Sequence, residues 1–111
     1  MDEINFKDFQ KLDMRVGEIV EVKRVPNTDK LYKIQVDIGK EDTIQTVSSL
    51  VDYYNEEELM NKRVVILVNL KNTKFCGEVS EGMLLASETE DESECVLLTP
   101  EKDIKLGSKV L

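Results

Sequence analysis

The chain has 111 residues, of which 41% are hydrophobic and 34% are charged, and this length and composition fit one globular domain. It contains no histidine, and its two cysteines, Cys76 and Cys95, form no CxxC pair, so we expect no metal site and no cofactor. The net charge of −8 argues against strong non-specific binding to a polyanion such as RNA.

The first part of the chain predicts a short helix followed by three strands. Residues 5–12 have a helical pattern, with Asn5 as the N-cap and Asp8 in the first turn. Apolar and polar residues alternate along 14–25 and most clearly along 32–38, which predicts two strands, and a third strand is expected at 43–48. Gly17 interrupts the alternation of the first strand and predicts a β-bulge there.

The second part predicts another short helix and three further strands. Asn55 is a suitable N-cap for a helix over 55–60, and Glu58 stands where a capping box places its acid. We interpret Glu56–Glu58 as acids that the helix dipole stabilises. The strands are expected at 64–68 (buried on both faces), at 83–86, and at 95–98 after an acidic hairpin tip at 88–94.

The order of these elements predicts the fold class. Three strands, a helix and further strands follow one another as in the OB-fold, so we expect an all-β protein with short helices: a five-stranded Greek-key barrel over residues 1–111, with N- and C-terminal extensions. The pattern alone fits another small β-barrel equally well. The apolar end of the chain, Lys109–Leu111, suggests packing against another surface.

Charge is unevenly distributed along the chain. Segments 56–58 and 88–94 together hold eight of the 23 acidic residues, so the rest of the chain carries 15 acids and 15 bases. A modest basic patch outside these two segments is therefore compatible with the acidic composition.

Three blocks of the sequence resemble one family of domains. They are Asp8–Ile19, then Asp29–Tyr32 with Val36–Gly39, and then Asn69–Met83 with its Ser-Glu-Gly-Met end. These blocks are similar to the tRNA-binding domain found at the C-terminus of methionyl-tRNA synthetases, in the endothelial monocyte-activating polypeptide II type, in stand-alone tRNA-binding proteins and in CsaA proteins. The resemblance covers nearly the whole chain and implies a non-catalytic OB-fold module that binds tRNA.

The resemblance also implies that residues 69–83 form much of the tRNA-facing surface. Lys71 and Lys74 are the only bases between Arg63 and Lys102, and lysines in a loop on a rigid barrel can contact phosphates. Neutral hydrogen-bonding side chains can reach sugars or base edges, and a methionine offers an apolar surface to a base. The residues expected to bind tRNA are Arg15, Lys30, Asn69, Lys71, Lys74, Ser80 and Met83.

Each of these residues also has a purely structural interpretation. Met83 begins an apolar strand and could pack in the core, Asn69 could bond to backbone, and Ser80 could belong to a plain turn. The lysines could be solvated surface charges. Phe75 is the sole aromatic residue of the segment, which favours recognition of folded tRNA by shape and backbone over stacking of single-stranded bases.

Three functional hypotheses follow. The first is a homodimeric tRNA-binding module, which could serve methionyl-tRNA synthetase as a separate subunit. The second is a CsaA-like chaperone or export factor that binds unfolded polypeptides, which suits the acidic balance better. The third is a dimerising appendage of a synthetase without RNA affinity, because Asn72 and Cys76 depart from the family's pattern.

Enzymatic and membrane functions are not expected. Cys76 is the only candidate nucleophile, and without a histidine base we interpret it as a half-buried loop thiol. No apolar run approaches the roughly 20 residues of a membrane helix. The polar, acidic N-terminus does not resemble a signal peptide, so we expect a cytoplasmic protein with reduced thiols.

Overall fold

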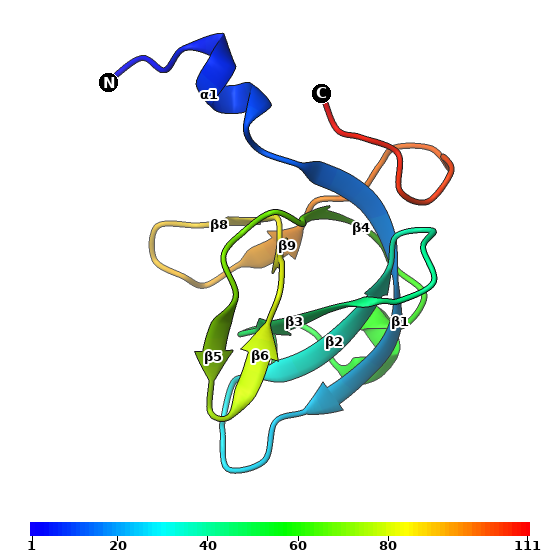
Figure 1. Ribbon diagram of the computed structural model, residues 1–111. Helices are drawn as coiled ribbons and strands as arrows, with labels where there is room; N and C mark the ends of the chain where they lie inside the picture. Colours follow the sequence, from blue (N-terminus) through cyan, green and yellow to red (C-terminus); the bar gives the residue numbers. More distant parts are fainter.

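The fold is built on one antiparallel sheet that curls into a nearly closed barrel (Figure 1). The computed structural model describes residues 1–111. Five strands pair in the order β3-β2-β1-β4-β7. Along the chain these strands are β1 (Met14–Arg24), β2 (Tyr32–Asp37), β3 (Ile44–Ser48), β4 (Arg63–Leu67) and β7 (Met83–Leu84). This confirms the expected OB-fold-like barrel with short helices.

Two helices and two hairpins complete the chain. The helices are α1 (Phe6–Gln10), which precedes β1, and α2 (Glu56–Leu59), which lies between β3 and β4. The hairpins are β5 (Thr73–Phe75) with β6 (Glu78–Ser80), and β8 (Ala86–Glu88) with β9 (Cys95–Leu97). Neither helix has the length and hydrophobicity that crossing a membrane would require.

The core is formed by alternate side chains of the barrel strands. β2 alternates between buried and half-buried residues along its whole length, as its sequence predicts. β4 also alternates, with Val64 and Ile66 fully buried and the residues between them half-buried. The expectation that this strand is buried on both faces is wrong, because a small barrel has one interior and only every second side chain reaches it.

The long strand β1 changes partners along its length. It pairs with β4 in its first half and with β2 in its second half. The β-bulge lies between Ile19 and Glu21, and the expectation of a bulge at Gly17 is wrong. Gly17 is required for another reason: a side chain there would meet Val36 of the neighbouring strand.

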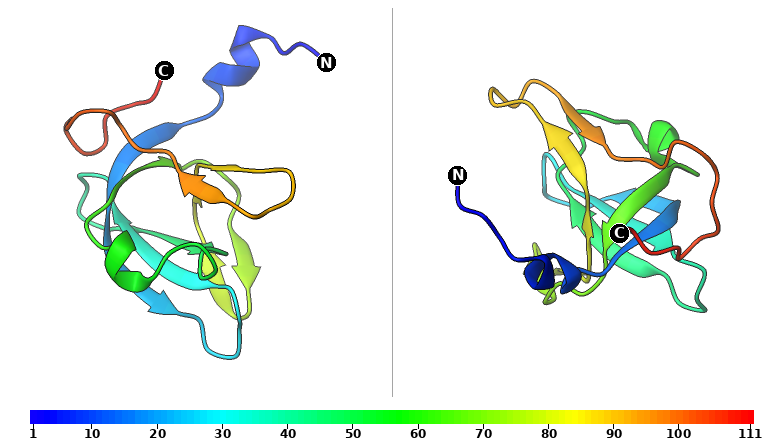
Figure 2. Two further views of the ribbon diagram at one scale, coloured as in Figure 1. Left: turned by 180° about the vertical axis from the view of Figure 1, so that it is seen from behind. Right: turned by 90° about the horizontal axis from the view of Figure 1, so that it is seen from above.

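The two helices differ in how they begin. Asn55 and Glu58 exchange side-chain and backbone hydrogen bonds of 2.8 and 2.9 Å, so the expected capping box is present. The side chain of Asn5 makes no such bond, so the expected cap of α1 is absent. α1 has no buried residue and projects away from the barrel in Figure 1 and in the left view of Figure 2.

Hydrogen bonds of side chains close the barrel between β3 and the segment that leads into β7. Ser80 Oγ accepts the backbone N–H of Val47 at 3.0 Å and donates to the carbonyl of Gly82 at 3.2 Å. Glu81 accepts the N–H of Gln45 through its carboxylate and donates its own N–H to the carbonyl of Gln45, both at 2.8 Å. The motif around Ser80 is therefore a closure device of the fold.

We expect Ser80→Ala to lower the free energy of unfolding by about 2 kcal/mol, because it leaves the buried N–H of Val47 without a partner. Urea denaturation measures this loss. Ser87→Ala is the matched control, since Ser87 is exposed and its hydroxyl makes no hydrogen bond. Equal midpoints for the two variants would mean that the Ser80 hydroxyl is dispensable for barrel closure.

The C-terminal segment covers the edge of β1 in its first half. The N–H of Gly107 donates to the carbonyl of Val16 at 2.8 Å, and the N–H of Val16 donates to the carbonyl of Ser108 at 3.0 Å. The N–H of Val110 donates to the carbonyl of Met14 at 2.9 Å. The expected packing is found in these backbone hydrogen bonds and in the half-buried Val110, while the side chain of Leu111 is 93% exposed.

Candidate functional site

The segment expected to be a loop, residues 69–82, contains the β5–β6 hairpin. Its two-residue turn is Cys76–Gly77, and both residues have a positive φ, of 51° and 86°, as a type I′ turn requires. Asparagine and glycine are the usual residues there, so Cys76-Gly77 gives little indication of a hairpin in the sequence. Cys76 is exposed at the tip, and the expectation of a half-buried thiol is wrong.

Contacts of β6 hold the hairpin against the barrel. Lys33 of β2 forms an ion pair of 3.5 Å with Glu78 of β6, and both side chains are about 30% exposed. The side-chain amide of Gln45 donates to the carbonyl of Val79 at 2.7 Å. β5 is the outer strand of the hairpin, and all of its residues are exposed. Its side chains therefore face solvent, while β6 attaches the hairpin to the barrel.

A groove of about 270 Å³ lies between this hairpin, β3 and the β8–β9 hairpin. Its floor includes buried leucines of the core. Its upper walls carry three large apolar side chains, Leu70, Phe75 and Met83, which are 46%, 42% and 54% exposed. Concave apolar surface that stays open to solvent is typical of binding sites.

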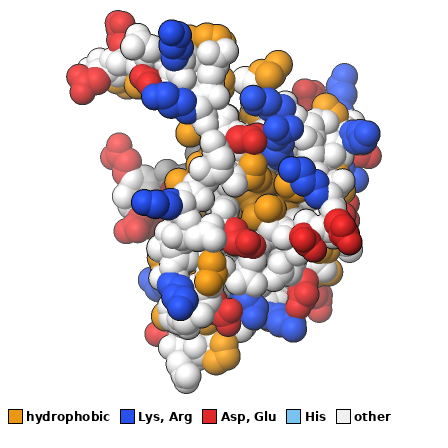
Figure 3. Space-filling model, viewed as in Figure 1, with side chains coloured by type: hydrophobic (Ala, Val, Ile, Leu, Met, Phe, Trp, Pro, Cys, Tyr) orange, Lys and Arg blue, Asp and Glu red, His pale blue; other side chains and the backbone are white.

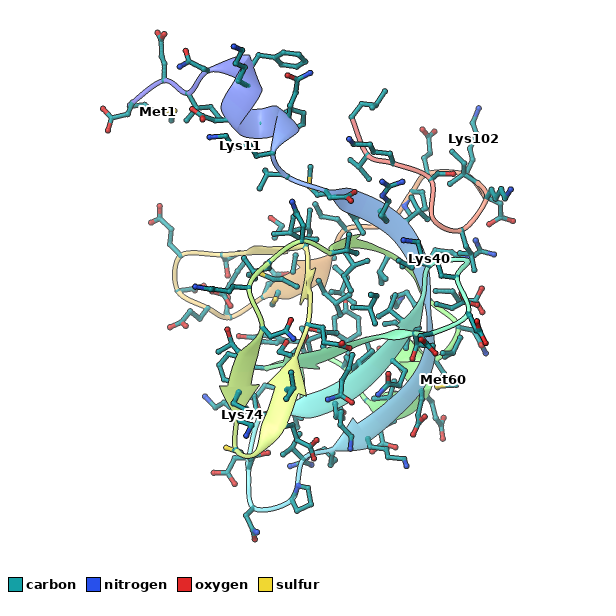
Figure 4. All side chains as sticks on the ribbon, viewed as in Figure 1. Met1, Lys11, Lys40, Met60, Lys74 and Lys102 are labelled. Carbon is teal, nitrogen blue, oxygen red and sulfur yellow. The ribbon has the colours of Figure 1, made fainter.

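One cation of the predicted site, Lys71, lines this groove, and a second, Lys74, lies beside it on β5. Lys74 projects from β5 on the face opposite to Thr73 and Phe75 (Figure 4). Neither lysine has an ion-pair partner within 4 Å, so both charges are available to an anionic ligand. Met83 is exposed on the groove wall, which excludes its interpretation as a core residue.

Three other predicted residues have partners within the chain. Asn69 accepts the N–H of Asp13 at 2.9 Å and donates to the carbonyl of Lys11 at 2.6 Å. Arg15 forms an ion pair of 2.6 Å with Asp13, and this hydrogen bond holds the pKa of the Asp13 carboxyl below its usual value. Ser80 is buried in the barrel closure described above. Asn69 and Ser80 thus hold segments that flank the groove, whereas Arg15 lies on β1 beside the C-terminal segment.

The last predicted residue, Lys30, lies in the turn between β1 and β2 and does not line the groove. Its Nζ is 3.8 Å from Asp52, and its side chain is 68% exposed. Sequence reasoning missed Leu70 as a wall residue, although a leucine within the expected loop, three residues after the end of β4, is a signal that could have found it. No cluster of histidine, cysteine, aspartate or glutamate in the chain could hold a metal ion.

The β8–β9 hairpin brings negative charge beside the groove. It projects from the edge of the barrel, with its acidic tip in solvent, as expected (Figure 2). Tyr53 donates its hydroxyl to the carbonyl of Glu92 at 2.7 Å and ties the tip to the barrel. Glu88 and Cys95 line the groove, and burial raises the pKa of the Cys95 thiol, so this thiol is protonated at neutral pH.

Known proteins share both the sequence and the fold of this chain. The chain is 51% identical over 111 residues to a methionine–tRNA ligase of Pyrococcus horikoshii and spans 15% of the length of that enzyme. The crystal structure of a MetRS-related protein from the same organism has a TM-score of 0.92 and 33% identity, with full coverage of both chains. The chaperone CsaA of Bacillus anthracis has a TM-score of 0.88 and 27% identity, with 99% and 100% coverage.

A sequence model of one domain family matches residues 14–109, and its description is "Putative tRNA binding domain". The match includes the whole barrel, the β5–β6 hairpin and the C-terminal segment that pairs with β1. The blocks that carry the resemblance in the sequence thus lie in one continuous structural unit. The chain belongs to the tRNA-binding domain family.

Proposed function

We propose that this chain binds folded tRNA as a non-catalytic module and that the groove with its β5–β6 hairpin is the contact surface. The observation that carries the proposal is that Lys71, just before the β5–β6 hairpin, and Lys74, within it, have no ion-pair partner, while Glu78 and Val79 tie the hairpin to the barrel. Lysines can contact phosphates as point charges, and this contact supplies much of the affinity for nucleic acid. The family match supports tRNA as the partner.

The groove walls add a short-range apolar contact to these charges. Phe75 and Met83 can pack against a base or a ribose, and the backbone of the RNA can lie along the two lysines. One aromatic side chain cannot read a run of bases, so recognition relies on the shape and backbone of the folded tRNA. Ser80 and Asn69 act in this proposal by positioning the surface.

The proposed assembly is a homodimer that serves methionyl-tRNA synthetase as a separate tRNA-capturing subunit. The support is the similarity to a MetRS-related protein over its whole length, together with the exposed apolar side chains of Ile4, Phe6 and Leu111. Two copies would present two weak sites at once and raise the effective affinity. Light scattering on the purified chain would give twice the mass of one chain if this holds.

A second candidate function is the binding of unfolded polypeptides, as in the protein named chaperone CsaA. The apolar lining of the groove and the adjacent Glu88 favour it. A peptide with apolar and basic side chains would fit the same surface, without any need for the phosphate contacts of Lys71 and Lys74.

One competition experiment separates the two functions. Fluorescently labelled bulk tRNA is titrated with the chain at 50 and 200 mM salt, and anisotropy is recorded with and without an unfolded polypeptide such as reduced, alkylated lactalbumin. We expect salt-sensitive tRNA binding that the polypeptide does not displace. Binding of the polypeptide alone, with no tRNA binding at 50 mM salt, would reject the tRNA module and favour the chaperone.

A further inference from the structure

Ion pairing divides the cations of this acidic protein into two classes. Six cations form ion pairs, with the side-chain nitrogen within 4 Å of a carboxylate oxygen: Lys11, Arg15, Lys23, Lys30, Lys33 and Arg63. The cations without a carboxylate partner include Lys71 and Lys74 of the proposed site. They also include Lys40, which lies far from Lys74 at the opposite side of the molecule (Figure 4), and Lys109 of the C-terminal segment.

The packing of the C-terminal segment brings the turn that carries Lys40 close to the segment that carries Lys109. A methyl group on Gly39 would approach the carbonyl oxygen of Leu106 to 2.8 Å, so the turn after β2 and the C-terminal turn are in direct contact. Arg15 of β1 forms a bridge pair with Lys109. We call Arg15, Lys40 and Lys109 the basic strip. Figure 3 shows that Lys and Arg side chains gather at the upper right of this view, with acidic and apolar side chains among them.

The electrostatic environment of the strip leaves it positive. Asp13 forms an ion pair with Arg15, so the negative charge of Asp13 is neutralised by Arg15. The hydrogen bond of Arg15 is the main reason that the pKa of Asp13 is lowered, and the charges of Lys109 and Lys40 lower it further. The carboxylates of Glu41 and Asp42 follow Lys40 in the same turn but pair with no base of the strip.

We propose that the basic strip is a second contact surface for RNA phosphates, which binds a part of the tRNA away from the groove. This inference rests on the proposed function, because it assigns the strip to the same ligand. A folded tRNA is larger than this domain, whose longest extent is 41 Å, so one tRNA can span both surfaces. The two free lysines supply the phosphate contacts, and Arg15 anchors the strip to β1.

The test is the salt dependence of tRNA binding by the variant Lys40→Gln with Lys109→Gln. Each lysine that contacts a phosphate contributes about one unit to the slope of log affinity against log salt. The variant is expected to have a slope shallower by about two, so that its loss of affinity is about tenfold greater at 50 mM than at 200 mM salt. Labelled bulk tRNA is the probe, and thermal unfolding verifies the fold of each variant.

The control is Lys11→Gln with Lys23→Gln, which makes the same change in net charge at two ion-paired lysines. A shallower slope in the strip variant alone supports the proposal. A wild-type slope in the strip variant, or equal losses in both variants, overturns it and leaves the proposed function intact. If the wild-type chain binds no tRNA at 50 mM salt, the proposed function fails, and the assignment of the strip fails with it.

Discussion

Replacement of both Lys71 and Lys74 by glutamate is expected to weaken tRNA binding at 50 mM salt roughly 30-fold or more. Each substitution removes a cation without an ion-pair partner and places an anion opposite a phosphate. The loss should shrink as salt rises, because the contribution of phosphate contacts falls with counterion concentration. Anisotropy titrations with labelled bulk tRNA at two salt concentrations measure both the loss and its salt dependence.

The matched control carries Lys11→Glu and Lys23→Glu, which shifts the net charge by the same amount away from the groove. We expect a loss of only a few-fold in this control from general repulsion. Both lysines of the hairpin are exposed, so the variant should unfold at the wild-type temperature. Equal affinities of the hairpin variant and the control would show that the groove is not the tRNA-facing surface.

Gly107→Ala is expected to lower the free energy of unfolding by roughly 3 kcal/mol. Gly107 has a φ of 87°, and a side chain in this left-handed region costs about 1–2 kcal/mol. An added methyl group would also overlap the carbonyl oxygen of Ile38. The turn must then shift, which weakens the hydrogen bonds of 2.8 and 3.0 Å that join this segment to Val16.

Gly77→Ala is the control for backbone conformation alone. Gly77 has nearly the same φ, 86°, but an added methyl group there would meet no atom within 4 Å. This control should lose only about 1 kcal/mol. Thermal unfolding compares the two, and we expect Gly107→Ala to melt about 10 °C or more below wild type. Similar melting temperatures for both variants would mean that the contact with Ile38 adds nothing.

The core strands were predictable because their signal is local. Tyr32 to Ile38 alternate apolar and polar residues, and this period matches the spacing of side chains on one face of a strand. The capping box of Asn55 and Glu58 has the same character, since both partners lie within one helical turn. The apolar run of β4 led to the wrong prediction that both of its faces are buried. An apolar composition does not distinguish a barrel strand from a strand that is buried on both sides.

The candidate site was predictable in part. Lys71, Lys74 and Met83 were identified from one segment, and the structure exposes all three at or beside the groove. Ser80 and Asn69 belong to the same segment, but their hydrogen-bond partners are the backbone groups of Val47, Asp13 and Lys11, which are remote in sequence. The residue types at these two positions therefore predicted hydrogen bonding, but they did not indicate which groups would be the hydrogen-bond partners.

The sequence by itself determined the barrel strands, the two helices, the acidic hairpin and the membership of the family, because each depends on neighbouring residues or on an ordered set of short blocks. It did not indicate the β5–β6 hairpin. Only the tertiary structure decided the barrel closure, the groove and the basic strip. The C-terminal segment pairs with β1, which sets Lys109 opposite Arg15, and it packs on the turn after β2 that carries Lys40. Such a juxtaposition is the product of long-range packing, which leaves no periodic pattern in the chain.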